Sequence, residues 1–313
     1  MNYSKPAITI QDQIAKLKAR GLRFDDEALA ESYLSNISYY RLRAYTYPFQ
    51  DNSHPDHPFT TDISFEEIIK LYVFDRKLRI LVFDALEKIE ISFRTQLIYH
   101  YSLAYGSQWP IDRLLYKDDR RFRRILDKLR KEIGRCNETF LDHYNKKYTS
   151  PLDPPAWMSI EVASFGLLSI MFSNLKVSSE KNIITNYYGV KRIGLIENWL
   201  HSFSNIRNIC CHHGRLWNRR LTTRISLPKK TNNLFVENKH ILDYKIYAAL
   251  CSMEYILRII SPSSTIKYRL IDLIDSQPFS QEKEMGFPTD WREEEFWKDD
   301  RQTTVKATKT EKG

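Results

Sequence analysis

Residues 64–106 read SFEEIIKLYVFDRKLRILVFDALEKIEISFRTQLIYHYSLAYG and hold a long, uninterrupted helical pattern. Ser64 and Glu67 have the spacing of a capping box, in which each side chain accepts a hydrogen bond from the other residue's backbone N–H. No Gly or Pro interrupts the stretch before Gly106. Apolar residues recur on one helical face at Val82, Leu86, Ile89, Phe93 and Leu97. We therefore predict one long helix that ends near Tyr105.

Helical patterns also dominate on both sides of this stretch, and we see neither an internal repeat nor a series of alternating strands. A second capping box at Thr9 and Asp12 opens a helix that stops at Gly21. Further helices are predicted at 25–37, 119–133, 138–147, 157–175, 179–189, 190–214, 240–260 and 264–276. The predicted fold class is therefore all-α, a helical bundle joined by loops.

The helical period is lost in residues 39–59, and this stretch ends in a linker rich in Pro, Asp, Asn and His that indicates a boundary. In residues 287–297, FPTDWREEEFW, aromatic side chains lie among acidic ones, so we expect this segment to dock on the basic body. The last residues are polar and predict disorder. The expected organisation is an N-terminal helical region, 1–60, a helical core, 61–276, a C-terminal docking segment, 277–300, and a disordered tail, 301–313.

The formal net charge of +9 and the pI near 9.2 favour a polyanionic partner. The basic residues are bunched, because residues 118–135 carry eight Lys or Arg and residues 215–224 carry four. Such clusters are typical of phosphate contacts, although a solvated helix face explains either one equally well. The candidate RNA-binding residues are Arg120, Arg121, Arg123, Arg124, Arg215, Arg219 and Arg220.

Several classes of protein are excluded by what the sequence lacks. No apolar run approaches the roughly 18–20 residues of a membrane span. The N-terminus has no apolar region typical of a signal peptide. Four irregularly spaced cysteines are too few for a disulfide framework. We expect a reduced, cytoplasmic protein that does not contact membranes.

Residues 207–213, RNICCHH, close the helix predicted at 190–214. On this helix, one face is apolar, with Trp199, Phe203, Ile206 and Cys210. The roughly opposite face is polar, with His201, Asn205, Asn208, His212 and Arg215. We therefore expect Asn208 and His212 to point away from the core, toward solvent, a cleft or a second subunit. The long side chain of Arg207 can reach the same side of the helix. Basic residues that complement the helix dipole are the alternative explanation.

A metal site does not fit this stretch. Ligands on a helix need a spacing of three or four residues to share a face, whereas Cys210, Cys211, His212 and His213 are consecutive. No second Cys/His pair exists elsewhere in the chain. We therefore expect no metal and no cofactor, and we interpret the cysteines as packing atoms.

Arg-Asn-x-x-x-His on a late helix of an all-α domain resembles the motif of HEPN ribonucleases, in which four to six residues lie between Arg and His; here four do. The segments KLKARGLRF, LSNISYYRLRAYTYPF, LEKIEISFRTQLIYHYS, PPAWMSIEVASFGLLS, RNICCHHGRLWNR and GFPTDWREEEFW resemble, in this order, the AbiD/AbiF type of abortive-infection protein. The resemblance covers roughly residues 5–300. It implies anti-phage defence, a HEPN-like core, metal-independent cleavage of single-stranded RNA, a homodimer and a structured non-coding RNA as a further partner.

The resemblance assigns catalytic roles to Arg207, Asn208 and His212. Supporting or second candidates are His213, which the helical period turns toward Phe203 and Ile206, and Arg94 and His100. An ion pair with Glu90, one turn earlier, accounts for Arg94 without a catalytic role. In WMSIE, Trp157 and Glu161 also match the family pattern, and we expect a structural role for them, with Glu161 paired on an apolar helix.

Two other functions fit the same residues. A non-catalytic RNA-binding protein would use Arg207, Asn208 and His212 to grip phosphate. An inert helical partner would use none of them, but such HEPN-type domains usually lack the Arg/His pair that this chain keeps. Loss of cleavage with retained RNA affinity on mutation distinguishes catalysis from binding.

Overall fold

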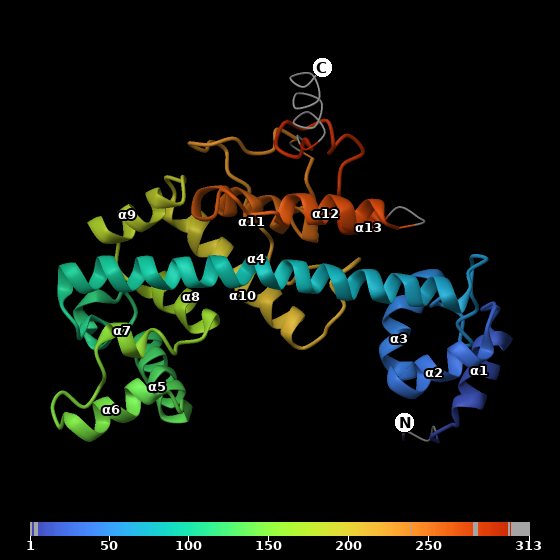
Figure 1. Ribbon diagram of the computed structural model, residues 1–313, viewed down its shortest axis with the longest axis horizontal. Helices are drawn as coiled ribbons and strands as arrows, with labels where there is room; N and C mark the ends of the chain where they lie inside the picture. The colour runs from blue at the N-terminus through green and yellow to red at the C-terminus, as the bar shows by residue number, and fades with distance from the viewer. Residues whose placement is uncertain (1, 3–5, 239, 278–280, 300, 302–313) are drawn as a thin grey trace, which may run out of the picture. The chain divides into compact units, whose positions relative to one another are not determined.

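The computed structural model describes residue 2, residues 6–238, 240–277 and 281–299, and residue 301 (Figure 1). All regular secondary structure in this part of the chain is helical, apart from three isolated β-bridges. The predicted all-α class is confirmed. Of the predicted tail at 301–313, residues 302–313 lie outside the described residues.

The helices are α1 (Ile10–Ala19), α2 (Glu27–Asn36), α3 (Tyr39–Thr46), α4 (Phe65–Tyr105), α5 (Asp119–Arg135), α6 (Thr139–Lys147), α7 (Ala156–Ser159), α8 (Phe165–Asn174), α9 (Ser179–Tyr187), α10 (Ile193–Cys211), α11 (Ile246–Ile260), α12 (Ile266–Asp275) and α13 (Glu282–Met285). Short 3-10 turns lie at Tyr47–Phe49, Trp109–Ile111 and Arg113–Leu115. None of the described helices combines the length and apolar character that a membrane span requires.

The long helix α4 forms as predicted. The Ser64 N–H donates to Glu67 Oε2 over 2.8 Å, and the Glu67 N–H donates to Ser64 Oγ over 3.2 Å, so the capping box is present. Gly106 follows the helix with φ of 80°, a left-handed conformation that glycine adopts without steric cost. The apolar stripe is buried at Val82, Leu86, Ile89, Phe93 and Leu97.

The chain divides into two compact units, Met1–Arg79 and Ile80–Gly313. The division falls inside α4, whereas the sequence analysis placed it at residue 60. In the first unit, the start of α4 packs with α3 through a buried polar cluster. The Tyr45 hydroxyl donates to Asp75 over 2.6 Å, and Arg79 binds both groups. These contacts assign the first turns of α4 to the N-terminal unit.

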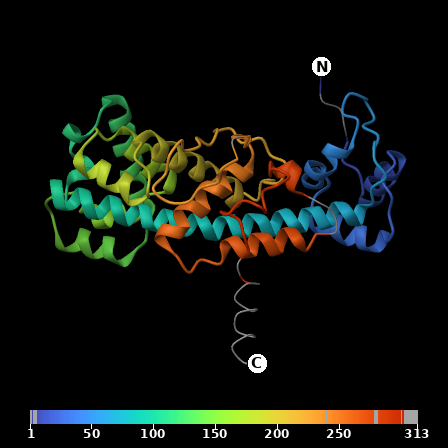
Figure 2. The same cartoon turned by 90° about the horizontal axis from the view of Figure 1, so that it is seen from above.

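In the second unit, α8 packs against both α5 and α10. Figures 1 and 2 both show α12 alongside α4, where an ion pair joins Arg269 to Asp84. The segment after α13 packs on α11, with Trp291, Phe296 and Trp297 all buried. Its contacts are mainly aromatic, although the Arg258 guanidinium also lies 4.2 Å from the Phe296 ring.

The single helix predicted at 157–175 is wrong, because the stretch forms α7 and α8 with a turn between them. Polar groups from other helices stabilise this turn. Glu132 of α5 accepts hydrogen bonds from the N–H and the hydroxyl of Ser164, the residue that caps α8. Trp157 and Glu161 are exposed. Glu161 therefore needs no buried partner, contrary to our expectation.

Candidate active site at the end of α10

Helix α10 has the two predicted faces over most of its length. Trp199, Phe203, Ile206 and Cys210 are buried, with at most 6% of each residue exposed. On the other side, His201 and Asn208 are exposed. Asn205 is half-buried, and its amide donates to Thr223 Oγ1 over 2.8 Å, so it holds the loop that follows the helix.

The helix ends at Cys211, earlier than predicted, and a Schellman turn closes it. The Gly214 N–H donates to the Ile209 carbonyl over 2.8 Å, and the His213 N–H donates to the Cys210 carbonyl over 3.1 Å. His212 is the C-cap residue and His213 follows it, and both are exposed. Arg215 lies beyond the turn, so the prediction that it continues the helical polar row is wrong.

His213 has φ of 56°, in the left-handed region that glycine usually occupies at this position of the turn. A residue with a Cβ pays about 1–2 kcal/mol for this conformation. The prediction that His213 turns toward Phe203 and Ile206 is wrong, since it lies outside the helix and is exposed. The strained turn instead presents two adjacent imidazoles at the surface.

Arg207 is 34% exposed and contacts two acceptors near the helix end. Its Nε lies 3.9 Å from Glu90 Oε2 of α4, and its Nη1 donates to Asn208 Oδ1 over 3.5 Å. The other oxygen of Glu90 accepts from Arg94 Nη2 over 2.9 Å, which confirms the predicted Glu90–Arg94 pair. The same carboxylate also faces Arg207, a contact that no sequence pattern predicts because it depends on how α4 packs near α10.

The two arginines beside Glu90 have unused donors. Arg94 Nη2 also donates to the Ala163 carbonyl over 2.8 Å. Within the described residues, however, the Nε atoms of Arg94 and Arg207 are buried and have no hydrogen-bond acceptor. A buried donor without an acceptor costs about 1–3 kcal/mol.

Not every candidate residue joins this cluster. His100 lies near Gln96, with 3.2 Å between His100 Nε2 and Gln96 Oε1, and its ring packs against Tyr99. Arg219 lies at the end of α10, where its Nη1 donates to the Arg215 carbonyl over 3.1 Å. The Arg219 Nη1 is also 3.6 Å from the position that a Cβ on Gly214 would take. Arg219 thus adds positive charge where the helix dipole is negative.

The remaining basic candidates differ in their pairing. Arg220 lies over the Tyr244 ring at 4.7 Å, and Arg215 lies 6.0 Å from the Trp217 ring centroid. On α5, Arg123 pairs with Asp119 over 2.8 Å. The neighbouring Arg120, Arg121 and Arg124 are exposed and form no ion pair among the described residues. These three guanidinium groups are therefore available to an external anion.

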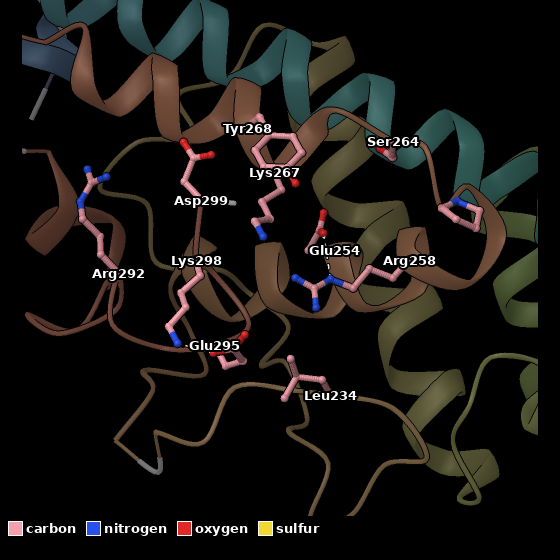
Figure 3. Close-up of a pocket in the computed structure, with 11 residues that line it drawn as sticks. Leu234, Glu254, Arg258, Ser264, Lys267, Tyr268, Arg292, Glu295, Lys298 and Asp299 are labelled. Carbon is pink, nitrogen blue, oxygen red and sulfur yellow. Dashed lines mark hydrogen bonds and ion pairs between the residues drawn. The ribbon is translucent and has the colours of Figure 1, made fainter. Parts of the chain in front are cut away.

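A separate pocket of about 600 Å³ lies between α11, α12 and the C-terminal segment (Figure 3). Its charged side chains largely neutralise one another. Arg258 Nε lies 3.1 Å from Glu254 Oε1, Lys298 pairs with Glu295, and Arg292 pairs with Asp275 outside the pocket lining. The pocket therefore offers an anion much less uncompensated charge than α5 does.

No group of three or more His, Cys, Asp or Glu side chains in the described part of the chain is arranged to hold a metal ion. Cys210 is buried and Cys211 is half-buried. The end of α10 presents the guanidinium of Arg207, the amide of Asn208 and the imidazole of His212.

The sequence profile of a family described as Abi-like protein matches residues 32–218, more than half of the 313 residues. The matched range includes α4, α5, α8 and α10, and it extends past His212 to Asn218. Comparisons with curated proteins and with solved structures find no match.

Proposed function

This chain belongs to the Abi-like protein family, and from that premise we propose that it is a cytoplasmic, metal-independent endoribonuclease that cleaves single-stranded RNA. Family membership indicates a role in abortive infection, a form of anti-phage defence. The finer proposal, a HEPN-type ribonuclease, rests on the chemistry at the end of α10.

One observation carries the proposal. Arg207 is partly exposed and lies between Glu90 and Asn208, while His212 is exposed at the end of the same helix. A fixed guanidinium beside a titratable imidazole is a pair of groups suited to phosphodiester cleavage. The exposed part of the Arg207 guanidinium favours the binding of an anion at the same place.

In the proposed reaction, the 2′-hydroxyl of the RNA attacks the adjacent phosphorus, and the bond from phosphorus to the 5′-oxygen breaks. His212 accepts the proton of the 2′-hydroxyl as general base, a role worth about 10²–10⁴-fold in rate. Arg207 donates hydrogen bonds to the phosphate as negative charge builds on its oxygens. Asn208 orients the Arg207 guanidinium. The products are a 2′,3′-cyclic phosphate and a 5′-hydroxyl.

A second proton-transfer group must protonate the leaving 5′-oxygen. We assign it to His212 of a second copy in a homodimer, with His213 of the same chain as the alternative. Exposed apolar side chains on α4 beside Glu90 favour such a dimer, since Ile91 is 52% exposed and Phe83 is 37% exposed. A structured non-coding RNA is the further partner we propose, and RNA recovered with the purified protein would identify it.

The test is cleavage of a 5′-labelled single-stranded RNA in the presence of EDTA. We expect fragments that end in a 2′,3′-cyclic phosphate. His212→Ala should lower kcat about 10²–10⁴-fold with RNA affinity retained. The matched control is His143→Ala, an exposed histidine on α6, which should cleave at the wild-type rate.

Two outcomes would contradict the proposal. Cleavage by His212→Ala at the wild-type rate would remove His212 from the mechanism. Binding of RNA without cleavage by the wild type, together with weaker binding by Arg207→Ala and His212→Ala, would make the chain a non-catalytic RNA-binding protein.

A further inference from the structure

A groove of about 570 Å³ lies between α5, α8 and α10, the three helices that pack together in the second unit. Helix α5 contributes Arg121, Arg124 and Lys128 to its wall. Helix α10 contributes His201, which lies on the same face of that helix as Asn208. The groove thus joins the basic helix to the helix that carries the candidate active site.

The positive charge in this groove is largely uncompensated. Arg121 and Arg124 are exposed and form no ion pair among the described residues. Lys128 has only a distant partner, Glu132, at 3.7 Å. In the pocket of Figure 3, by contrast, Arg258 and Lys298 each have an acidic partner inside the pocket lining.

The one acidic residue in the groove wall, Glu197, is paired with two lysines that do not line the groove. Its Oε1 lies 2.7 Å from Nζ of Lys181, a fully buried lysine, and 3.9 Å from Nζ of Lys117. The neighbouring Asn198 is also occupied, since its amide donates to the Arg224 carbonyl and accepts from the Ser226 N–H. Glu197 therefore does not cancel the charge of the α5 arginines.

The floor of the groove combines apolar side chains with Ser169 and Ser173, and one imidazole ring lies at its edge. Ile170 is 42% exposed there, and the buried Ile125 and Leu167 also line the wall. His201 presents an exposed imidazole at the α10 side. Cations beside an apolar surface and a flat ring match a nucleotide of single-stranded RNA, whose phosphate is anionic and whose unstacked base has an apolar face.

We propose that this groove binds one nucleotide of the RNA substrate at a distance from the cut, with its phosphate on Arg121 and Arg124 and its base against Ile170 and His201. This inference rests on the proposed function and adds to it a substrate-binding subsite. His201 and His212 are separated along α10 by about 16 Å at 1.5 Å per residue. One extended strand that follows the helix would reach both, so the groove selects where the strand is cut.

The first experiment measures the affinity of a fluorescent single-stranded RNA in the His212→Ala background, where binding is seen without cleavage. Arg121→Ala with Arg124→Ala should weaken binding at least 10-fold. It should also reduce the slope of log Kd against log salt by about 1.4, at about 0.7 per phosphate contact. The matched control is Lys131→Ala with Arg135→Ala, two exposed cations of α5 outside the groove, which should leave both quantities unchanged.

The second experiment tests the base-binding side. His201→Ala and Ile170→Ala should each weaken RNA binding by about 5- to 100-fold, the range for loss of one stacked base, with no change in the salt slope. In the chain with His212 restored, all the groove variants should raise KM and leave kcat close to the wild-type value. Unchanged thermal unfolding confirms that the exposed positions do not disturb the fold.

The possible outcomes test the proposed subsite and the proposed nuclease activity independently. If the wild type cleaves RNA and the groove variants match the control pair, the subsite is wrong and the proposed function stands. If no variant cleaves RNA but the groove variants lose affinity, the subsite stands and the catalytic proposal fails. Groove-dependent binding of an acidic peptide in place of RNA would overturn the assignment of the occupant.

Discussion

Helices α10 and α11 carry similar residues but place them in opposite surroundings. Both are largely apolar and both carry cysteine, yet α11 is buried continuously from Ile246 to Leu257 and is covered by the C-terminal aromatic segment. Burial raises the pKa of the Cys251 thiol and of the Glu254 carboxyl, although Arg258 opposes the shift at Glu254. At the end of α10, by contrast, His212 is exposed. The Cys251 thiol and the Glu254 carboxyl of α11 are thus buried in the core, whereas the His212 imidazole at the end of α10 is accessible to solvent.

Mutation of the aromatic segment that covers α11 should have the largest effect on stability. Trp297 is 2% exposed, and its indole N–H donates to the Tyr247 hydroxyl over 3.1 Å. Trp297→Ala should lower the free energy of unfolding by about 3–5 kcal/mol, since it leaves a large cavity and removes the indole hydrogen bond to the Tyr247 hydroxyl. Urea denaturation measures this. If the free energy of unfolding fell by less than about 1 kcal/mol, the packing of the C-terminal segment on α11 would not contribute substantially to stability.

Mutation at the exposed end of α10 should instead have a large effect on the cleavage rate and little effect on stability. Arg207→Ala should reduce kcat about 10²–10³-fold, the cost of removing one donor to a developing oxyanion. Its unfolding midpoint should change little, since Arg207 is partly exposed. Arg76→Ala, on the exposed side of α4 in the other unit, is the control for loss of charge. Equal effects of both variants would contradict a specific role for Arg207.

Glu90 lies between two arginines and links α4 to the candidate site. Glu90→Gln should reduce kcat about tenfold, because the neutral amide still binds Arg94 but attracts Arg207 less strongly. Steady-state kinetics should show this change in kcat with KM for RNA close to the wild-type value. Glu87→Gln, one turn earlier and exposed, should match the wild type. A Glu90 variant with full activity would leave the carboxylate with a purely structural role.

The strained turn after α10 predicts a smaller, stabilising change. His213→Gly should raise the free energy of unfolding by about 0.5–1 kcal/mol, because glycine adopts φ of 56° without the clash of a Cβ but has more freedom when unfolded. His212→Gly, at φ of −87°, should lower it instead. Thermal denaturation compares the two. The same change in both variants would argue against strain at His213.

Thiol labelling compares the two helices without any mutation. Cys211 and Cys136 are half-buried and should react with a thiol reagent in the folded protein. Cys210 and Cys251 are buried, and they should react only after unfolding, most clearly Cys251 because burial also raises its pKa. Mass spectrometry of the labelled peptides identifies the sites. Rapid labelling of Cys251 would show that the C-terminal segment opens readily.

Local patterns were enough to predict most of the helices and the buried faces of α4 and α10. They did not predict α3 (Tyr39–Thr46), which lies in the stretch where we expected the helical period to be lost. The capping box of Ser64 and Glu67 lies within one turn, and the stripe from Val82 to Leu97 repeats every three or four residues, so the geometry of both follows from the helical period alone. The same period failed at 157–175, where Glu132 from a distant helix stabilises a break at Ser164. It failed again after Cys211, because a Schellman turn ended the helix without a glycine at His213.

The sequence by itself determined the all-α class, the buried face of α10 and the residue types available for chemistry at its end, because propensity and periodicity act within a few residues. Only the tertiary structure decided that Glu90 faces Arg207, that Glu197 is neutralised by the buried Lys181, and that α5, α8 and α10 enclose a groove. These features join residues far apart in the chain. They depend on how whole helices pack, which no local pattern encodes.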